Sequence, residues 1–340
     1  MTALPATVND RSVWDVWLSA YHMPVVTVAD EVGTFKALSG RSLTSEELAA
    51  ELGLNARALT IHLIVLAGLG FVERREGHWR ATAEARRWLH PEAEAYFGGL
   101  LEGPRRSNPL HAQLLETLQT GDKATGHGSA AEEWERGEMS DELAERVTAL
   151  MEAHSRAPAR AVAMQPRFAD VRSFMDVGGG SGIFSIELAR AWPHLQTTVM
   201  DIAAVCRQAA KYAAAAGMTD RVATASVNMF TEEWPRQHDA HFFSNIFHDW
   251  SDKTCRLLAE KSFGSLPSGG TILLHEMLID DDLCGPLTTA SFSILMLLGT
   301  RGRQYTFGEL RDFLEGAGFI DVQSEVTGGG YYSLVSARKP

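Results

Sequence analysis

The chain has 340 residues, enough for two domains that each bury a core of their own. Its 31 basic and 43 acidic residues give a formal net charge of −12 at pH 7, which argues against nucleic acid or an anionic membrane as a partner. The three cysteines lack metal-ligand spacing, and we find neither a signal peptide nor an apolar run of membrane-spanning length. We therefore expect a cytoplasmic protein with free thiols.

The first part of the chain is expected to be helical. Apolar residues recur at helical spacing over residues 12–38, where Pro24 is expected to divide the stretch into two helices. A second helical stretch follows over residues 43–53. Thr44 or Ser45 can cap it, and the glutamates in its first turn are also typical of a helix start.

A winged-helix module is predicted by the elements that follow. Residues 54–69 continue the helical pattern, and residues 71–81 have the pattern of a β-hairpin that turns at Gly77. Such a module also allows a DNA-binding regulator as an alternative function. The second helix carries only Arg57 as a cation, whereas a helix that reads a DNA groove needs several phosphate contacts. We therefore favour a scaffold for dimerisation.

A long helix is expected to begin at Asp141 and to end near residue 165, linking two domains. We place a winged-helix and helical domain at residues 1–160 and a second domain at residues 161–340.

The second domain begins with a glycine-rich loop after an apolar strand that ends in Asp176. Glycines stand at 178, 179, 180 and 182, ahead of an amphipathic helix pattern. The spacing does not match the dinucleotide fingerprint, and a phosphate loop would need a lysine. The pattern Asp-x-Gly-x-Gly-x-Gly is that of the S-adenosylmethionine (SAM) methyltransferases. A structural glycine turn is the alternative.

Strands and helices alternate in the rest of the chain, which predicts an α/β fold with a parallel sheet. The last residues, from Ile320 to Ala337, predict two strands around a glycine turn, hence an antiparallel hairpin. This is the Rossmann-like arrangement of the class I methyltransferases. The expected strands are residues 172–177, 196–200, 222–226, 240–246 and 270–276, and the expected helices are 183–191, 203–216, 253–265 and 306–317.

Polar residues follow the expected strands at the ends where such sheets bind ligands. Asp176 can hold the ammonium of SAM, and Asp201, followed by Ile202, suits the ribose hydroxyls. The other cofactor-binding candidates come from the loop and the later strands: Gly178, Gly180, Asn228, Met229, Phe230, Ser244 and Trp250. His248 follows the fourth expected strand and Glu276 ends the fifth, and these two are the catalytic candidates.

Taken together, the chain resembles the plant- and bacterial-type small-molecule O-methyltransferases that have an N-terminal winged-helix dimerisation domain. The glycine loop, Asn-Met-Phe at 228–230, Phe-His-Asp-Trp-Ser-Asp at 247–252 and its spacing to Glu276 carry this resemblance. It implies that His248 is the general base and that Glu276 orients it. It also implies a homodimer formed through the N-terminal helices, which are rich in apolar side chains, and a role in secondary metabolism.

Two departures from the family pattern keep an alternative open. The family has an acid where Asn228 stands, and a second acid near Gln304. A glutamine does not share the charge of a protonated histidine, so the acceptor atom can also be carbon, on an activated ring or beside a keto group, in some relatives with a metal. His248 and Asp249 offer two ligands, but a third at recognisable spacing is missing, so we predict no metal.

The small-molecule acceptor is expected to bind between the two domains. The segment 151–155 resembles the family stretch whose methionine clamps the acceptor. The candidates are Met151 and His154, with Phe292, Met296 and Trp250 as walls. For the apolar residues an ordinary core position is the alternative. The expected function is methyl transfer from SAM to a hydroxyl of a small aromatic metabolite.

Overall fold

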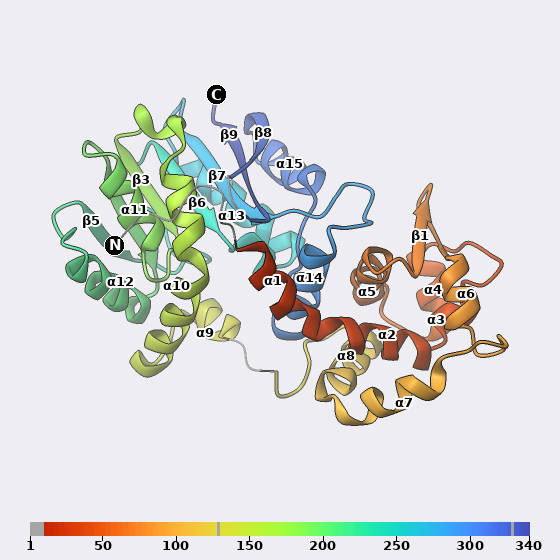
Figure 1. Ribbon diagram of the computed structural model, residues 1–340. Helices are drawn as coiled ribbons and strands as arrows, with labels where there is room; N and C mark the ends of the chain where they lie inside the picture. Colours follow the sequence, from red (N-terminus) through yellow and green to blue (C-terminus); the bar gives the residue numbers. More distant parts are fainter. Residues whose placement is uncertain (1–9, 128–129, 328–329) are drawn as a thin grey trace. The chain divides into compact units, whose positions relative to one another are not determined.

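The computed structural model describes residues 10–127, 130–327 and 330–340. Its contacts divide the chain into two compact units (Figure 1). The sheet unit consists of Met1–Arg11, Ala130–Met277 and Phe307–Pro340, and the helical unit consists of Ser12–Ser129 and Leu278–Thr306. This division differs from a single cut at residue 160, because residues from Ala130 onward pack with the sheet and residues 278–306 return to the helices.

The sheet unit contains a seven-stranded sheet with the order β5-β4-β3-β6-β7-β9-β8. The first five strands in this order are parallel, and β9 pairs antiparallel with both β7 and β8. The predicted parallel sheet with an antiparallel C-terminal hairpin is therefore confirmed, although residues 328 and 329 of the predicted turn lie outside the described residues. The strands are β3 (Ser173–Val177), β4 (Gln196–Asp201), β5 (Val222–Ser226), β6 (Ala240–Ser244), β7 (Thr271–Met277), β8 (Ile320–Val326) and β9 (Tyr332–Arg338).

Helices connect and cover these strands. The helices of the sheet unit are α9 (Ala131–Arg136), α10 (Asp141–Ala163), α11 (Ile183–Ala191), α12 (Ala203–Ala215), α13 (Asp252–Ser265) and α15 (Phe307–Gly316). The long helix α10 packs against α11 and α12, which explains why it belongs to the sheet unit. Its cap is the Ser140 hydroxyl, which accepts from the backbone N–H of Leu143.

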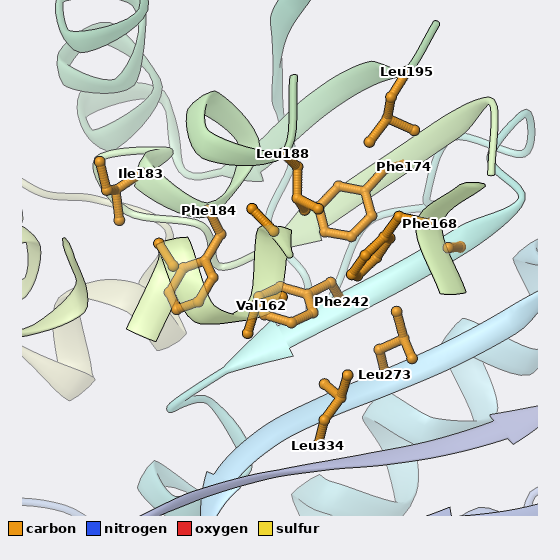
Figure 2. Packing of buried hydrophobic residues seen from close by; sticks show 13 residues of the cluster. Val162, Phe168, Phe174, Ile183, Phe184, Leu188, Leu195, Phe242, Leu273 and Leu334 are labelled. Atoms are coloured by element: carbon orange, nitrogen blue, oxygen red, sulfur yellow. The ribbon is translucent and has the colours of Figure 1, made fainter. Parts of the chain in front are cut away.

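Aromatic side chains fill the core between α10, α11 and the sheet (Figure 2). The ring of Phe242 on β6 lies 5.4 Å from that of Phe174 on β3 and 5.0 Å from that of Phe184 on α11. Val162 of α10 belongs to the same cluster and is fully buried. Burial of each such side chain stabilises the fold by about 1.5–3 kcal/mol. This packing fixes the start of α11, and with it the glycine loop, against the ends of the strands.

The helical unit begins with α1 (Arg11–Leu18), a 3-10 turn at Ser19–Tyr21 and α2 (His22–Glu31). The predicted interruption is present, but it falls before Pro24, which lies in the first turn of α2. Proline is tolerated there because the first N–H groups of a helix have no partner within the helix.

The elements of the predicted winged-helix module occur in the expected order. They are α4 (Ser45–Leu52), α5 (Ala56–Gly68), β1 (Val72–Arg75) and β2 (His78–Ala81). Thr44 is the cap of α4, in a capping box with Glu47. Gly77 turns the hairpin with φ +81°. The assignment of these elements as a winged helix stays a prediction.

The helical unit also contains α3 (Thr34–Ala37), α6 (Ala83–Trp88), α7 (Gly98–Ser107), α8 (Pro109–Thr120) and α14 (Leu287–Gly299). In the described part of the chain no single helix is long and apolar enough to cross a membrane. The pair α4 and α5 reaches that length and composition only jointly, across a bend of 111°.

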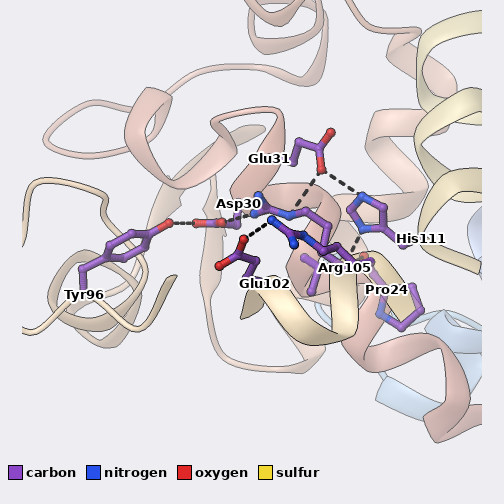
Figure 3. A network of polar contacts seen from close by, with 9 residues as sticks. Pro24, Asp30, Glu31, Tyr96, Glu102, Arg105 and His111 are labelled. Carbon is purple, nitrogen blue, oxygen red and sulfur yellow. Dashed lines mark hydrogen bonds and ion pairs between the residues drawn. The ribbon is translucent and has the colours of Figure 1, made fainter. Parts of the chain in front are cut away.

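A polar network joins α2 to α7 and α8 (Figure 3). The buried Asp30 carboxylate forms an ion pair with Arg105 and accepts a hydrogen bond from the Tyr96 hydroxyl at 2.7 Å. Glu31 Oε2 lies 3.3 Å from Arg105 Nε and 2.9 Å from His111 Nε2. Buried charges require partners of this kind. The network therefore accounts for the buried carboxylate and holds the three helices together.

Candidate active site

The parallel strands bring the predicted polar residues to one edge of the sheet. Asp201 is the last residue of β4 and Ser244 the last residue of β6. Asp176 and Glu276 are the last residues but one of β3 and β7. The pairing of Ser244 with His275 next to Glu276 puts the ends of β6 and β7 side by side. Ligands bind at this edge in open α/β sheets.

The glycine loop between β3 and α11 adopts the left-handed backbone conformation that favours glycine. The φ angles are +68° at Gly178, +57° at Gly180 and +73° at Gly182. A Cβ added at Gly180 would meet no atom of the described residues within 4 Å. The loop therefore leaves an open space beside its backbone at Gly180, where a ligand can lie against it.

Two buried carboxylates stand beside this loop. Burial raises the pKa of Asp176 to about 7, against a hydrogen bond that Ser185 Oγ donates at 3.0 Å. Burial likewise raises the pKa of Asp201 to about 6, against hydrogen bonds from the backbone N–H groups of Ile202 and Gly180 and from the Trp134 indole. A positively charged ligand stabilises the ionised form of such carboxylates. The ammonium group of SAM is a charge of this kind, and its contact with Asp176 stays a prediction.

Asn228, Met229 and Phe230 follow β5, as predicted. The Asn228 side chain is engaged at both ends, because Nδ2 donates to the Glu135 carbonyl at 3.1 Å and Oδ1 accepts from the Phe230 N–H at 2.9 Å. The ring of Phe230 packs edge-on against that of Trp250, with centroids 4.7 Å apart. Met229 and Trp250 are buried.

His248 lies in a short 3-10 turn, Phe247–Asp249, directly after β6. Its Nδ1 is 3.4 Å from Glu276 Oε2, and both side chains are almost fully buried. Glu276 Oε1 accepts from the backbone N–H groups of Ile246 at 3.1 Å and Phe247 at 2.9 Å. Burial, and secondly the charge of Asp249, raise the pKa of Glu276 to about 8. The carboxyl group is thus fixed by the turn that carries the histidine.

Ser244 is also committed to a contact within the sheet unit. Its hydroxyl lies 2.9 Å from His275 Nδ1, and the His275 ring stacks on Tyr332 with centroids 4.6 Å apart. Burial lowers the pKa of His275 to about 3, so this ring is neutral near pH 7. His275 and Tyr332 therefore hold Ser244 in place, and neither was predicted as a site residue.

The acceptor candidates fall in both compact units. Met151 and His154 lie half-buried on α10, where burial lowers the pKa of His154 to about 4. Phe292 and Met296 are buried on α14 of the helical unit, and Phe292 packs against Trp14 at 5.4 Å and Trp17 at 6.4 Å. A core role accounts for the Phe292 contacts. The role of these four residues in acceptor binding stays a prediction.

The described residues include no group of three His, Cys, Asp or Glu side chains arranged to hold a metal ion. The absence of a metal from the reaction stays a prediction.

Comparison with known proteins identifies the family. A model of the O-methyltransferase domain matches residues 110–320, more than half of the chain. The chain belongs to the O-methyltransferase family. It is a SAM-dependent methyltransferase that transfers methyl groups to oxygen.

Alignments with similar proteins cover most of this methyltransferase. It is 37% identical to 3-hydroxy-5-methyl-1-naphthoate 3-O-methyltransferase from Streptomyces sahachiroi over 313 residues, which are 91% of this chain and 89% of the relative. It is 28% identical to the tetracenomycin polyketide synthesis 8-O-methyl transferase TcmO from Streptomyces glaucescens over 95% of both chains. Its fold is similar to that of an O-methyltransferase family 2 protein from Planctomyces limnophilus, with a TM-score of 0.85, 24% identity and full coverage of both chains.

Proposed function

We propose that this methyltransferase methylates a phenolic hydroxyl of a small aromatic metabolite in secondary metabolism, with His248 as the general base. The contact between His248 Nδ1 and Glu276 Oε2, 3.4 Å long and buried, is the observation that carries the assignment of the base. The naphthoate and tetracenomycin relatives support an aromatic acceptor.

SAM, when bound, supplies a methyl group that its sulfonium makes electrophilic. The protein must then remove the hydroxyl proton, since a phenol has a pKa of about 10 and is mostly protonated at neutral pH. His248 accepts this proton at Nε2 while its Nδ1–H faces Glu276, which fixes the tautomer. The ionised Glu276 stabilises the imidazolium that forms.

The cofactor assignments follow from the chemistry of each group. Asp176 faces the ammonium group, Asp201 accepts from the ribose, and Gly178 and Gly180 let the ligand lie against the loop. Adenine packs against apolar side chains and bonds with the second N–H or the second lone pair of the Asn228 amide, beyond the two contacts described above. The remaining residues proposed to contact the cofactor are Ile202, Met229, Phe230, Ser244 and Trp250.

We also propose that the enzyme is a homodimer, and that Met151, His154, Phe292 and Met296 contact the acceptor. Apolar side chains exposed on α1 support the dimer.

The test is His248→Ala, assayed against a panel of phenols and hydroxynaphthoates. We expect kcat to fall by about 10²–10⁴-fold, while calorimetry finds the affinity for S-adenosylhomocysteine (SAH) unchanged. His194→Ala, at an exposed histidine of the same unit, is the matched control and should keep full activity. Unchanged turnover in His248→Ala would exclude this base. A C-methyl rather than an O-methyl signal in the product NMR spectrum would contradict the assignment of a phenolic oxygen as the acceptor atom.

A further inference from the structure

The short helix α9 lies against two groups that the proposed function gives to the adenosine part of SAM. The indole Nε1 of Trp134 donates to Asp201 Oδ1 at 3.0 Å. The carbonyl of the next residue, Glu135, accepts from Asn228 Nδ2 at 3.1 Å. Both contacts join α9 to the ends of strands far along the chain, so α9 is built into the edge of the cofactor site.

Apolar packing holds this segment in place. Trp134 and Met139 pack against a buried cluster formed by Ala144, Ile202, Ala204 and Val205. Gly137 ends α9 with φ +74°, and a Cβ there would lie 2.9 Å from Asn228 Nδ2. Glycine is therefore needed both for the left-handed conformation and for the close approach to Asn228. The indole thus packs against Ile202 and donates to Asp201, the residue before it.

The hydrogen bonds of Asp201 define what the carboxylate can still accept. Oδ1 accepts from Trp134 Nε1 at 3.0 Å and from Ile202 N at 2.8 Å, and Oδ2 accepts from Gly180 N at 3.1 Å. The two oxygens of a carboxylate offer about four acceptor positions. One position on Oδ2 therefore remains, enough for a single hydroxyl donor.

We propose that Trp134 is a positioning residue for the cofactor, whose indole N–H fixes Asp201 so that Oδ2 accepts one hydroxyl of the ribose. The inference rests on the proposed function, which assigns Asp201 to the ribose. Trp134 acts in two ways: its N–H holds the carboxylate in one orientation, and it stabilises the ionised form of that carboxylate.

Trp134→Phe tests this because it keeps an aromatic ring and removes the N–H. The expected result is a rise of about tenfold in the Kd for SAH and the KM for SAM, with kcat at saturating SAM within about twofold of the wild type. Trp192→Phe is the matched control, because its indole Nε1 donates to the Ala163 carbonyl at 2.9 Å in the same unit. It should leave both constants unchanged.

A ligand lacking the ribose hydroxyls separates the inference from its premise. With the 2′,3′-dideoxy analogue of SAH, the wild type should lose affinity relative to SAH, and Trp134→Phe should lose clearly less. Equal affinity of the wild type for both ligands would overturn the assignment of Asp201 to the ribose, and the inference with it. If the wild type discriminates and Trp134→Phe discriminates equally, or if Trp134→Phe binds SAH more tightly, the role of Trp134 alone is overturned.

Discussion

The Glu276 carboxyl should control the pH dependence of the reaction. Its pKa is raised from 4.5 to about 8, first by burial and then by the charge of Asp249. Below pH 8 the carboxyl is mostly protonated and cannot stabilise a positively charged His248, whereas above pH 8 it is mostly ionised. We therefore expect kcat of the wild type to rise between pH 6 and pH 9, measured at saturating SAM and acceptor.

Glu276→Gln isolates this charge, because a glutamine oxygen can still accept from the N–H groups of Ile246 and Phe247. We expect kcat at pH 8 to fall by about 10²-fold and the rise with pH to disappear. Because the folded state holds this proton more tightly than the unfolded chain, the free energy of unfolding of the wild type falls as pH rises from 4.5 to 8. The variant lacks this loss, so it should not be less thermally stable than the wild type at pH 9.

Asp239→Asn is the control for this change. Asp239 Oδ2 also accepts from two backbone N–H groups, those of Arg172 and Ser173, but at the opposite ends of the strands. Its pH profile should match that of the wild type. A Glu276→Gln profile that keeps the rise toward pH 9 would show that another group titrates.

The positions of several candidate site residues could be predicted because a parallel sheet brings the ends of its strands together wherever they stand in the sequence. Asp176, Asp201, His248 and Glu276 follow from this rule and from local patterns. Trp134 could not be predicted in the same way, because its contact with Asp201 spans 67 residues and depends on how α9 packs. The partner of Asn228, the Glu135 carbonyl, is a backbone group that no side-chain pattern reveals.

The glycine loop allows a prediction at the scale of an element. Gly180 and Gly217 both have left-handed φ, +57° and +69°, and a Cβ at either would meet no described atom within 4 Å. Alanine at either position should therefore cost a similar free energy of unfolding, about 1 kcal/mol. Only Gly180→Ala places a methyl group in the proposed cofactor space, so its Kd for SAH should rise at least about tenfold.

Gly217→Ala should bind SAH like the wild type and lose a similar amount of thermal stability. Calorimetry with SAH and thermal melts of both apo variants provide the comparison. Equal SAH affinity for the two variants would place the cofactor away from Gly180.

Elements with a regular period were predicted more accurately than their breaks. The strands and helices that were predicted in the sheet unit occur within a few residues of their expected bounds, because alternating and helical apolar patterns reflect burial on one face. The short helix α9 was not predicted. The break before α2 was predicted at Pro24 but falls at Ser19–Tyr21. Proline is compatible with a first helical turn, so it did not determine the break.

The division of the whole chain was less accessible from sequence. The predicted boundary at residue 160 follows the change of pattern along the chain, whereas the structure groups Ala130–Met277 with the sheet and Leu278–Thr306 with the helices. The helix α14 is buried on nearly all sides and packs against α5. Composition shows that such a helix must be buried, but not against which partner.

The oligomeric state is the prediction that concerns the whole molecule. Val13, Val16 and Trp17 lie at helical spacing on α1 and are 72%, 75% and 49% exposed. Exposed apolar side chains that adjoin one another favour an interface between proteins. If this face forms the proposed homodimer, Val16→Glu should bury an unpaired charge in the interface and halve the mass measured by light scattering at micromolar concentration. Met164→Glu, at an isolated apolar residue that is 77% exposed, should keep the wild-type mass. A monomeric wild type, or a dimeric Val16→Glu protein, would place any partner surface elsewhere than on α1.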